Sequence, residues 1–95
     1  RIKGKNQVLI RQVFTQLRGE GVGRANPAGV GFPEPRTHWM IEEETVKDHF
    51  AGKVSSSSNP RSVYKQAMDA LIGSGHAVLN DGFIWFTDSN GKYKE

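Results

Sequence analysis

The stretch 59–87 constrains the fold of this chain more than any other part of it. It opens with Asn-Pro, which suits a helix N-cap and first position, because the proline N–H is not needed there. Apolar residues then recur at helical spacing as far as Gly73 and Gly75, where glycine favours a helix end. We therefore predict a helix over 60–73. Its apolar face is formed by Tyr64, Ala67, Met68 and Leu71.

A β-hairpin is expected directly after this helix. Two short strands, Ala77–Asn80 and Phe83–Thr87, flank the dipeptide Asp81-Gly82. That dipeptide favours a type I′ turn, in which both central residues have positive φ. Large apolar side chains alternate on both faces of the second strand, so we interpret Trp85 as a core residue.

A helix and a long loop are predicted for the first part of the chain. The helix begins near Asn6, a suitable N-cap, and runs to about Gly19. The segment 19–36 contains five glycines and three prolines and is predicted to be a loop. A loop of this length in a small domain is either functional or mobile.

A short strand and another helix are predicted before residue 59. The segment Thr37–Ile41 is rich in β-formers, and we expect it to pair with the hairpin and to place Trp39 against Trp85. Three glutamates at 42–44 mark the start of a helix, since carboxylates are favoured there, with Thr45 as an alternative cap. Gly52 is expected to end this helix.

This order of elements predicts one α+β domain over 1–95, a winged helix-turn-helix with three helices and a small three-stranded antiparallel sheet. Residues 1–5 resemble the end of a linker and 88–95 a tail, so we expect a domain excised from a longer protein.

The composition excludes several classes of protein. No apolar run approaches the length of a membrane span, and mean hydropathy is −0.57, so we expect no membrane partner. Cysteine is absent, which permits a reducing compartment, and we expect a cytoplasmic location. The three histidines are far apart in sequence, and no catalytic motif is present. We therefore expect a non-catalytic domain without a metal or cofactor.

The polar face of the helix over 60–73 predicts DNA binding. In a helix-turn-helix, the N-terminal residues of the last helix lie near base edges. Arginine and glutamine can read guanine and adenine, while lysine and serine suit phosphates. The alternative for each cation is an ordinary solvated position. The candidate contacts are Lys5, Arg11, Lys53, Ser58, Asn59, Arg61, Ser62, Lys65 and Gln66.

Two features favour other interpretations. The net charge of +3 allows a polyanionic partner without requiring one. The predicted hairpin tip has an acid, Asp81, and no cation, so we do not expect it to contact a groove. The alternative function is protein–protein docking, in which the aromatic hairpin and Trp39 contact another domain or subunit of the parent protein.

Two segments resemble a known family. GKNQ at 4–7 and RSVYKQAMDALIGSGHAVLNDGFIWF at 61–86 are similar to the C-terminal winged-helix region of RepA-type, RecA-like ATPases and primase-helicases of phages and plasmids. The matching positions are Arg61, Tyr64, Ala67, Leu71, Gly75, Asp81, Gly82 and Trp85. The resemblance covers about a third of the chain and implies a winged helix attached to a replication protein that engages DNA or neighbouring domains. No ATP-binding motif is present, so no ATPase activity is implied for these residues.

Overall fold

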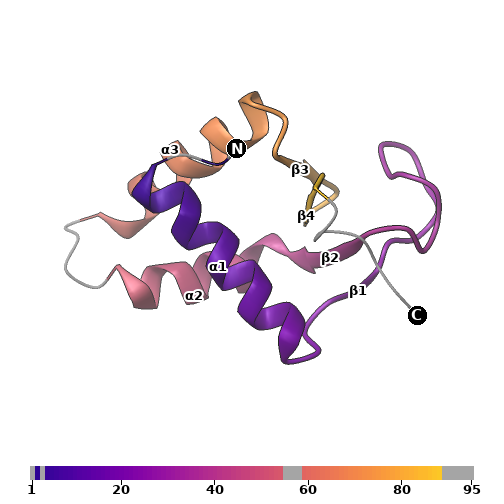
Figure 1. Ribbon diagram of the computed structural model, residues 1–95, viewed down its shortest axis with the longest axis horizontal. Helices are drawn as coiled ribbons and strands as arrows, with labels where there is room; N and C mark the ends of the chain where they lie inside the picture. Colours follow the sequence, from indigo (N-terminus) through magenta and orange to yellow (C-terminus); the bar gives the residue numbers. More distant parts are fainter. Residues whose placement is uncertain (1, 3, 55–58, 89–95) are drawn as a thin grey trace.

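Three helices and a four-stranded antiparallel sheet form the computed structural model, which describes residues 2, 4–54 and 59–88 (Figure 1). The strands lie in the order β1-β2-β4-β3. The predicted α+β class is therefore confirmed. The elements are α1 (Lys5–Gly19), β1 (Arg24–Ala25), β2 (Trp39–Glu42), α2 (Glu43–Lys53), α3 (Pro60–Gly73), β3 (Ala77–Asn80) and β4 (Phe83–Phe86).

The ends of α3 follow the predicted chemistry. The Asn59 side chain accepts a hydrogen bond from the backbone N–H of Ser62 at 3.2 Å, and Pro60 occupies the first turn. Gly75, with φ of 81°, reverses the chain after the helix. The helix could be predicted from these end residues, because capping residues bond to backbone groups that have no partner inside the helix.

The predicted ends of the other two helices are partly wrong. Asn6 lies inside α1, which begins at Lys5 after Gly4 and has no side-chain cap. Thr45 lies inside α2, whose N-cap is Glu42, and that helix continues one residue past Gly52. The start of α2 is set by tertiary structure, because the N–H of Glu43 donates to the carbonyl oxygen of Gly82 in the hairpin at 2.8 Å.

The prediction of a three-stranded sheet is wrong, because β1 adds a fourth strand from within the Gly/Pro-rich segment. Arg24 and Ala25 pair with Met40 and Trp39 of β2. The preceding Gly23 makes this approach possible, since a Cβ atom there would collide with the carbonyl oxygen of Met40. The second strand covers Trp39–Glu42 rather than the predicted 37–41.

The hairpin has the predicted turn. Asp81 and Gly82 have φ of 52° and 77°, the positive values that a type I′ turn requires. β4 lies between β2 and β3, with Ile84 opposite both Ile41 and Leu79. Alternation along the strands places Ile41, Ile84 and Phe86 on the face toward the helices.

One core lies between this face of the sheet and the three helices. Each helix contributes one apolar stripe, which explains why the helical periodicity in the sequence was informative. The cluster consists of Ile10, Val13, Phe14, Leu17, Ile41, Val46, Phe50, Tyr64, Ala67, Met68, Leu71, Ala77, Ile84 and Phe86.

The opposite face of the sheet is covered by the segment between β1 and β2, which projects beyond the sheet in Figure 1. The Phe32 ring lies 5.6 Å from that of Trp85 and 6.4 Å from that of Phe83. Trp85 is 4% exposed, which confirms it as a core residue. Its expected partner, Trp39, lies on the helix side of the sheet with Ile41 and donates from Nε1 to the Val22 carbonyl at 2.9 Å.

One buried asparagine organises this covering segment. Asn26 is 2% exposed, and its Oδ1 accepts from the backbone N–H groups of Thr37 and His38 at 2.9 Å each. Its Nδ2 donates to the carbonyls of Pro33 at 3.0 Å and Glu34 at 2.9 Å. The predicted loop is thus a folded layer whose backbone groups bond to one side chain.

Candidate nucleic-acid interface

The first two turns of α3 present a polar surface. Arg61, Ser62, Lys65 and Gln66 are all exposed, because Tyr64 and Ala67 take the buried face of this part of the helix. Asn59 is also exposed at the start of the helix. The structure therefore brings five of the predicted contact residues together on one end of one helix.

The two cations of this surface differ in their surroundings. Lys65 Nζ lies 3.3 Å from Asp69 one turn later, but both side chains are well exposed. Exposed i, i+4 pairs of this kind stabilise a helix by only about 0.3–0.5 kcal/mol, so a phosphate can replace the aspartate as a partner. Arg61 makes no ion pair or hydrogen bond with any other residue that the structure describes.

Acidic residues face this side of α3 from the neighbouring helix. A groove of about 470 Å³ runs between α2 and α3, and we call it the α2–α3 groove. Carboxylates, cations and apolar side chains all contribute to its lining. It is lined by Glu43, Glu44, Lys47, Asp48, Ala51, Arg61, Tyr64, Lys65, Met68, Asp69, Ile72 and Leu79. The carboxylates of α2 limit how far a polyanion can extend toward that helix.

Tyr64 connects the core to this groove. Its hydroxyl donates to Glu43 Oε2 at 3.3 Å, and its ring packs edge-on against Phe50 with centroids 5.6 Å apart. Burial, together with the neighbouring Glu43 carboxylate, raises the pKa of the Tyr64 hydroxyl well above its ordinary value. Tyr64 therefore keeps its proton and serves as a hydrogen-bond donor between α3 and α2.

On the other side of α3, the start of α1 contributes further polar groups. Lys5, Asn6 and Gln7 line a depression of about 240 Å³ together with Val63 and Gln66 of α3. Figure 1 shows the start of α1 beside α3. Lys5 is exposed here and makes no ion pair within the described residues. Lys5 and Gln66, which are 61 positions apart in sequence, thus belong to one surface.

Two further candidates, Lys53 and Ser58, come between the last turn of α2 and the start of α3 in the sequence. Lys53 is exposed at the end of α2, before the connection to α3. Ser58 lies outside the residues that the structure describes.

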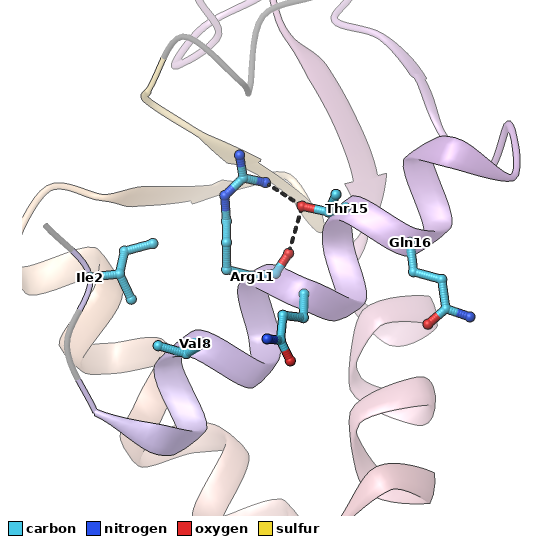
Figure 2. Close-up of a pocket in the computed structure, with 6 residues that line it drawn as sticks. Ile2, Val8, Arg11, Thr15 and Gln16 are labelled. Atoms are coloured by element: carbon cyan, nitrogen blue, oxygen red, sulfur yellow. Dashed lines mark hydrogen bonds between the residues drawn. The ribbon is translucent and has the colours of Figure 1, made fainter.

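Arg11 is held by its own domain. Its guanidinium lies 3.2 Å from Asp88 Oδ1 and 4.6 Å from the centre of the Phe86 ring, and it donates to Thr15 Oγ1 at 3.0 Å. Figure 2 shows Arg11 and Thr15 on one side of a depression of about 400 Å³, with Ile2 and Val8 on the other. Only 15% of the Arg11 side chain is exposed. We therefore interpret Arg11 as a cation that stabilises the domain through Asp88, Phe86 and Thr15.

The hairpin tip adds no cation to the surface. Asp81 and Gly82 are exposed, and Asn80 donates from Nδ2 to the carbonyl of Val30 in the covering segment at 3.0 Å. Asn80 therefore helps to attach that segment to the sheet.

Two groups of residues that shape this region were missed at the level of sequence. Glu43 and Glu44 were expected only to favour the start of a helix, yet they line the groove beside Arg61 together with Asp48. Asn26 was not singled out, because one asparagine among glycines and prolines is an ordinary loop composition. The only signal in the sequence was the unusual length of that loop.

The part of the chain that the structure describes shows neither a grouped set of metal ligands nor a membrane-spanning helix. Within it, no three histidine or acidic side chains are grouped so that they could hold a metal ion. None of its helices combines the length and apolar character needed to cross a bilayer.

Comparison with known proteins gave no match to a family model, to a curated protein or to a solved structure.

Proposed function

We propose that this chain is a winged-helix module that binds DNA through the first two turns of α3. The observation that carries the proposal is the exposed group of Arg61, Ser62, Lys65 and Gln66 on the second helix of the α2–α3 pair. In helix-turn-helix proteins, residues at this place contact base edges and phosphates. Lys5 and Lys53 flank the group and supply phosphate contacts.

The order of elements supports a winged helix. Without β1, the chain reads helix, strand, helix, helix and hairpin, and the last strand lies between the other two. That arrangement is the one expected for a winged helix-turn-helix. β1 and the segment that follows it are an addition at the edge formed by β2. We further propose, as the family resemblance implies, that the parent of this chain is a DNA-processing or replication protein of a mobile element.

The distribution of charge sets the orientation of the DNA. The Glu43, Glu44 and Asp48 carboxylates of α2 repel phosphates along the α2–α3 groove. The start of α1 contributes Lys5 and no acid within its first turn. We therefore place the DNA over the first two turns of α3, across Arg61 and Lys65 at the rim of the α2–α3 groove and toward Lys5 at the start of α1, with Arg11 and the hairpin tip outside the contact.

A salt titration tests the proposal. With Lys5, Lys53, Arg61 and Lys65 each on a phosphate, the logarithm of the binding constant should fall against the logarithm of salt concentration with a slope of about −3.6. Fluorescence anisotropy with a labelled duplex and a labelled single strand measures the slope and shows which form is preferred.

A matched pair of double variants locates the interface. Arg61→Ala with Lys65→Ala should weaken duplex binding and reduce the slope by about 2. Arg24→Ala with Arg36→Ala removes the same charge from β1 and the segment that follows it, and should leave the slope nearly unchanged. Equal effects of the two double variants would show a general charge effect, and an unchanged affinity in the first would remove α3 from the interface.

A further inference from the structure

The outward face of α1 differs from the exposed faces of the other two helices. α2 and α3 each expose both acids and cations along their length. On α1, only the first of the exposed residues is charged. These residues are Lys5, Val8, Gln12, Thr15, Gln16 and Gly19. Depletion of charge distinguishes the centre of a protein interface from the rest of a protein surface, so this face suits contact with another protein.

Most of these exposed residues form one continuous stripe along α1. Their spacing alternates between three and four positions, which is the spacing at which a helix presents a straight seam to a paired helix. The stripe consists of Lys5, Val8, Gln12, Thr15 and Gly19. The depression in Figure 2 lies along it, with Ile2 and Val8 on one side and Thr15 on the other. The seam is therefore open over its whole length.

The two charges at the ends of this stripe are placed against the dipole of their own helix. A helix N-terminus favours acids and a C-terminus favours cations. Lys5 is instead the first residue of α1, and Glu20 is its C-cap. Neither forms an ion pair within the described residues, and Glu20 accepts only a hydrogen bond from Gln16 at 3.1 Å. Both charges would be favourably placed beside a second helix that runs in the opposite direction.

We propose that two copies of this chain associate through α1, with the two helices antiparallel about a two-fold axis. In the register that aligns the stripes, Val8 lies opposite Gly19 of the second copy, and Gln12 lies opposite Thr15 of the second copy. Because the axis is two-fold, each of these contacts occurs twice. All four residues are exposed in the single chain, so none has to be uncovered before the copies meet.

This register also brings opposite charges together. Lys5 of each copy lies beside Glu20 of the second copy and near the C-terminal end of its α1, where a cation is favoured. Gly19 leaves room for the Val8 side chain, since a Cβ atom at Gly19 would meet nothing within 4 Å in its own chain. A second copy of this chain therefore supplies the complement in charge and in shape.

The other flank of the seam and the size of the contact limit its strength. Arg11 of one copy comes near Arg18 of the second copy, and the Asp88 carboxylate, 3.2 Å from the Arg11 guanidinium, offsets the repulsion. Each copy contributes one helix of 15 residues, which is about 22 Å long. Because such a contact is smaller than a standard interface, we expect a weak dimer that depends on protein concentration.

The proposal does not depend on DNA binding, and it is tested without DNA. Lys5 belongs to both proposed surfaces, whereas Glu20 lies at the opposite end of α1. Glu20→Lys should weaken self-association without lowering the affinity for DNA. Arg61→Ala with Lys65→Ala should lower the affinity for DNA without weakening self-association.

Sedimentation equilibrium over a wide range of protein concentration tests the dimer. The mass should rise from that of a monomer to that of a dimer. Lys5→Glu and Glu20→Lys should each weaken the association by about fivefold to tenfold, because each turns two attractive pairs into repulsive ones. The double variant should restore it. Each single change agrees better with the dipole of α1, so urea denaturation should show no loss of stability.

Lys53→Glu is the matched control for Lys5→Glu. It makes the same change of charge at an exposed position at the end of α2 and should leave the association unchanged. A monomeric mass throughout, an equal effect of the control, or a double variant that associates no better than the single ones would overturn the proposal.

Introduced cysteines test the register, since the chain has no cysteine of its own. Val8→Cys with Gly19→Cys should form disulfides between position 8 of one copy and position 19 of the second under mild oxidation. The two positions of one chain are 11 residues apart, about 16 Å along the helix, which is too far for a disulfide within α1. Gly19→Cys alone should form almost no cross-linked dimer, for the same reason of distance. Cross-links mainly between identical positions would contradict the antiparallel pairing.

Discussion

On the face of the sheet toward the helices, Ile41, Ile84 and Phe86 pack into a core to which all three helices contribute. On the opposite face, Met40 and Trp85 are just as deeply buried, but the aromatic cover comes from Phe32 in a single irregular segment. The helix face depends on many apolar contacts spread over long elements. The outer face depends on one ring and one asparagine, so the two faces should respond differently to substitution.

The largest effect is expected on the helix face. Phe86→Ala removes a fully buried ring that lies 5.0 Å from the Phe14 ring and beneath the Arg11 guanidinium. We expect a loss of about 3–5 kcal/mol in the free energy of unfolding, measured by urea denaturation. Phe83→Ala, in the same strand but half-buried on the outer face, is the control and should cost clearly less. Equal losses would mean that the two faces do not differ as described.

The next largest effect concerns the asparagine under the covering segment. Asn26→Ala leaves part-buried N–H and C=O groups of that segment without their partner, and we expect a loss of about 2–3 kcal/mol. Asn80→Ala removes one hydrogen bond to the same segment, at an exposed contact, and should cost about 0.5 kcal/mol. A loss for Asn26→Ala no larger than that for Asn80→Ala would show that water replaces the Asn26 bonds readily.

A smaller effect is expected from the ring that covers Trp85. Phe32 is half-buried, so Phe32→Ala should cost about 1–2 kcal/mol. In a Trp39→Phe background, Trp85 is the only tryptophan, and its emission should shift to longer wavelength as the cover is lost. An unshifted emission would mean that other residues keep Trp85 from water.

The smallest effect at neutral pH concerns the polar member of the helix-face core. Tyr64→Phe removes the hydrogen bond to Glu43 and should cost about 1 kcal/mol. Because the folded state holds the phenol proton more tightly than the unfolded chain, the Tyr64 contribution is present below pH 10.0 and is lost as the pH rises above it. The wild-type protein should therefore lose stability in alkali faster than Tyr64→Phe, as measured by urea midpoints across this pH range. Parallel curves would contradict the assignment.

How far the fold could be predicted varied along the chain for a physical reason. Asn59, Gly75 and the Asp81-Gly82 turn act over a few residues, so their signals were readable without a structure. The start of α2 could not be predicted in this way. The N–H of Glu43 donates to an acceptor in the hairpin, which comes about 40 residues later in the chain.

The candidate site shows the same division. The polar face of α3 followed from helical spacing, since Tyr64 and Ala67 had to be buried. The surroundings of individual cations could not be predicted from helical spacing. Arg11 and Arg61 both lie on amphipathic helices, yet Arg11 meets Asp88 and Phe86 from the far end of the chain, and Arg61 remains exposed beside the α2 carboxylates.

The amino-acid sequence by itself determined three helices, a hairpin with its turn, and which stripe of each helix is buried. These properties follow from backbone capping, allowed φ values and apolar periodicity, all of which act locally. Tertiary structure alone decided the fourth strand, the partner of Trp85 and the charges around α3. Each of these depends on contacts between distant residues, and their geometry exists only once the core has formed.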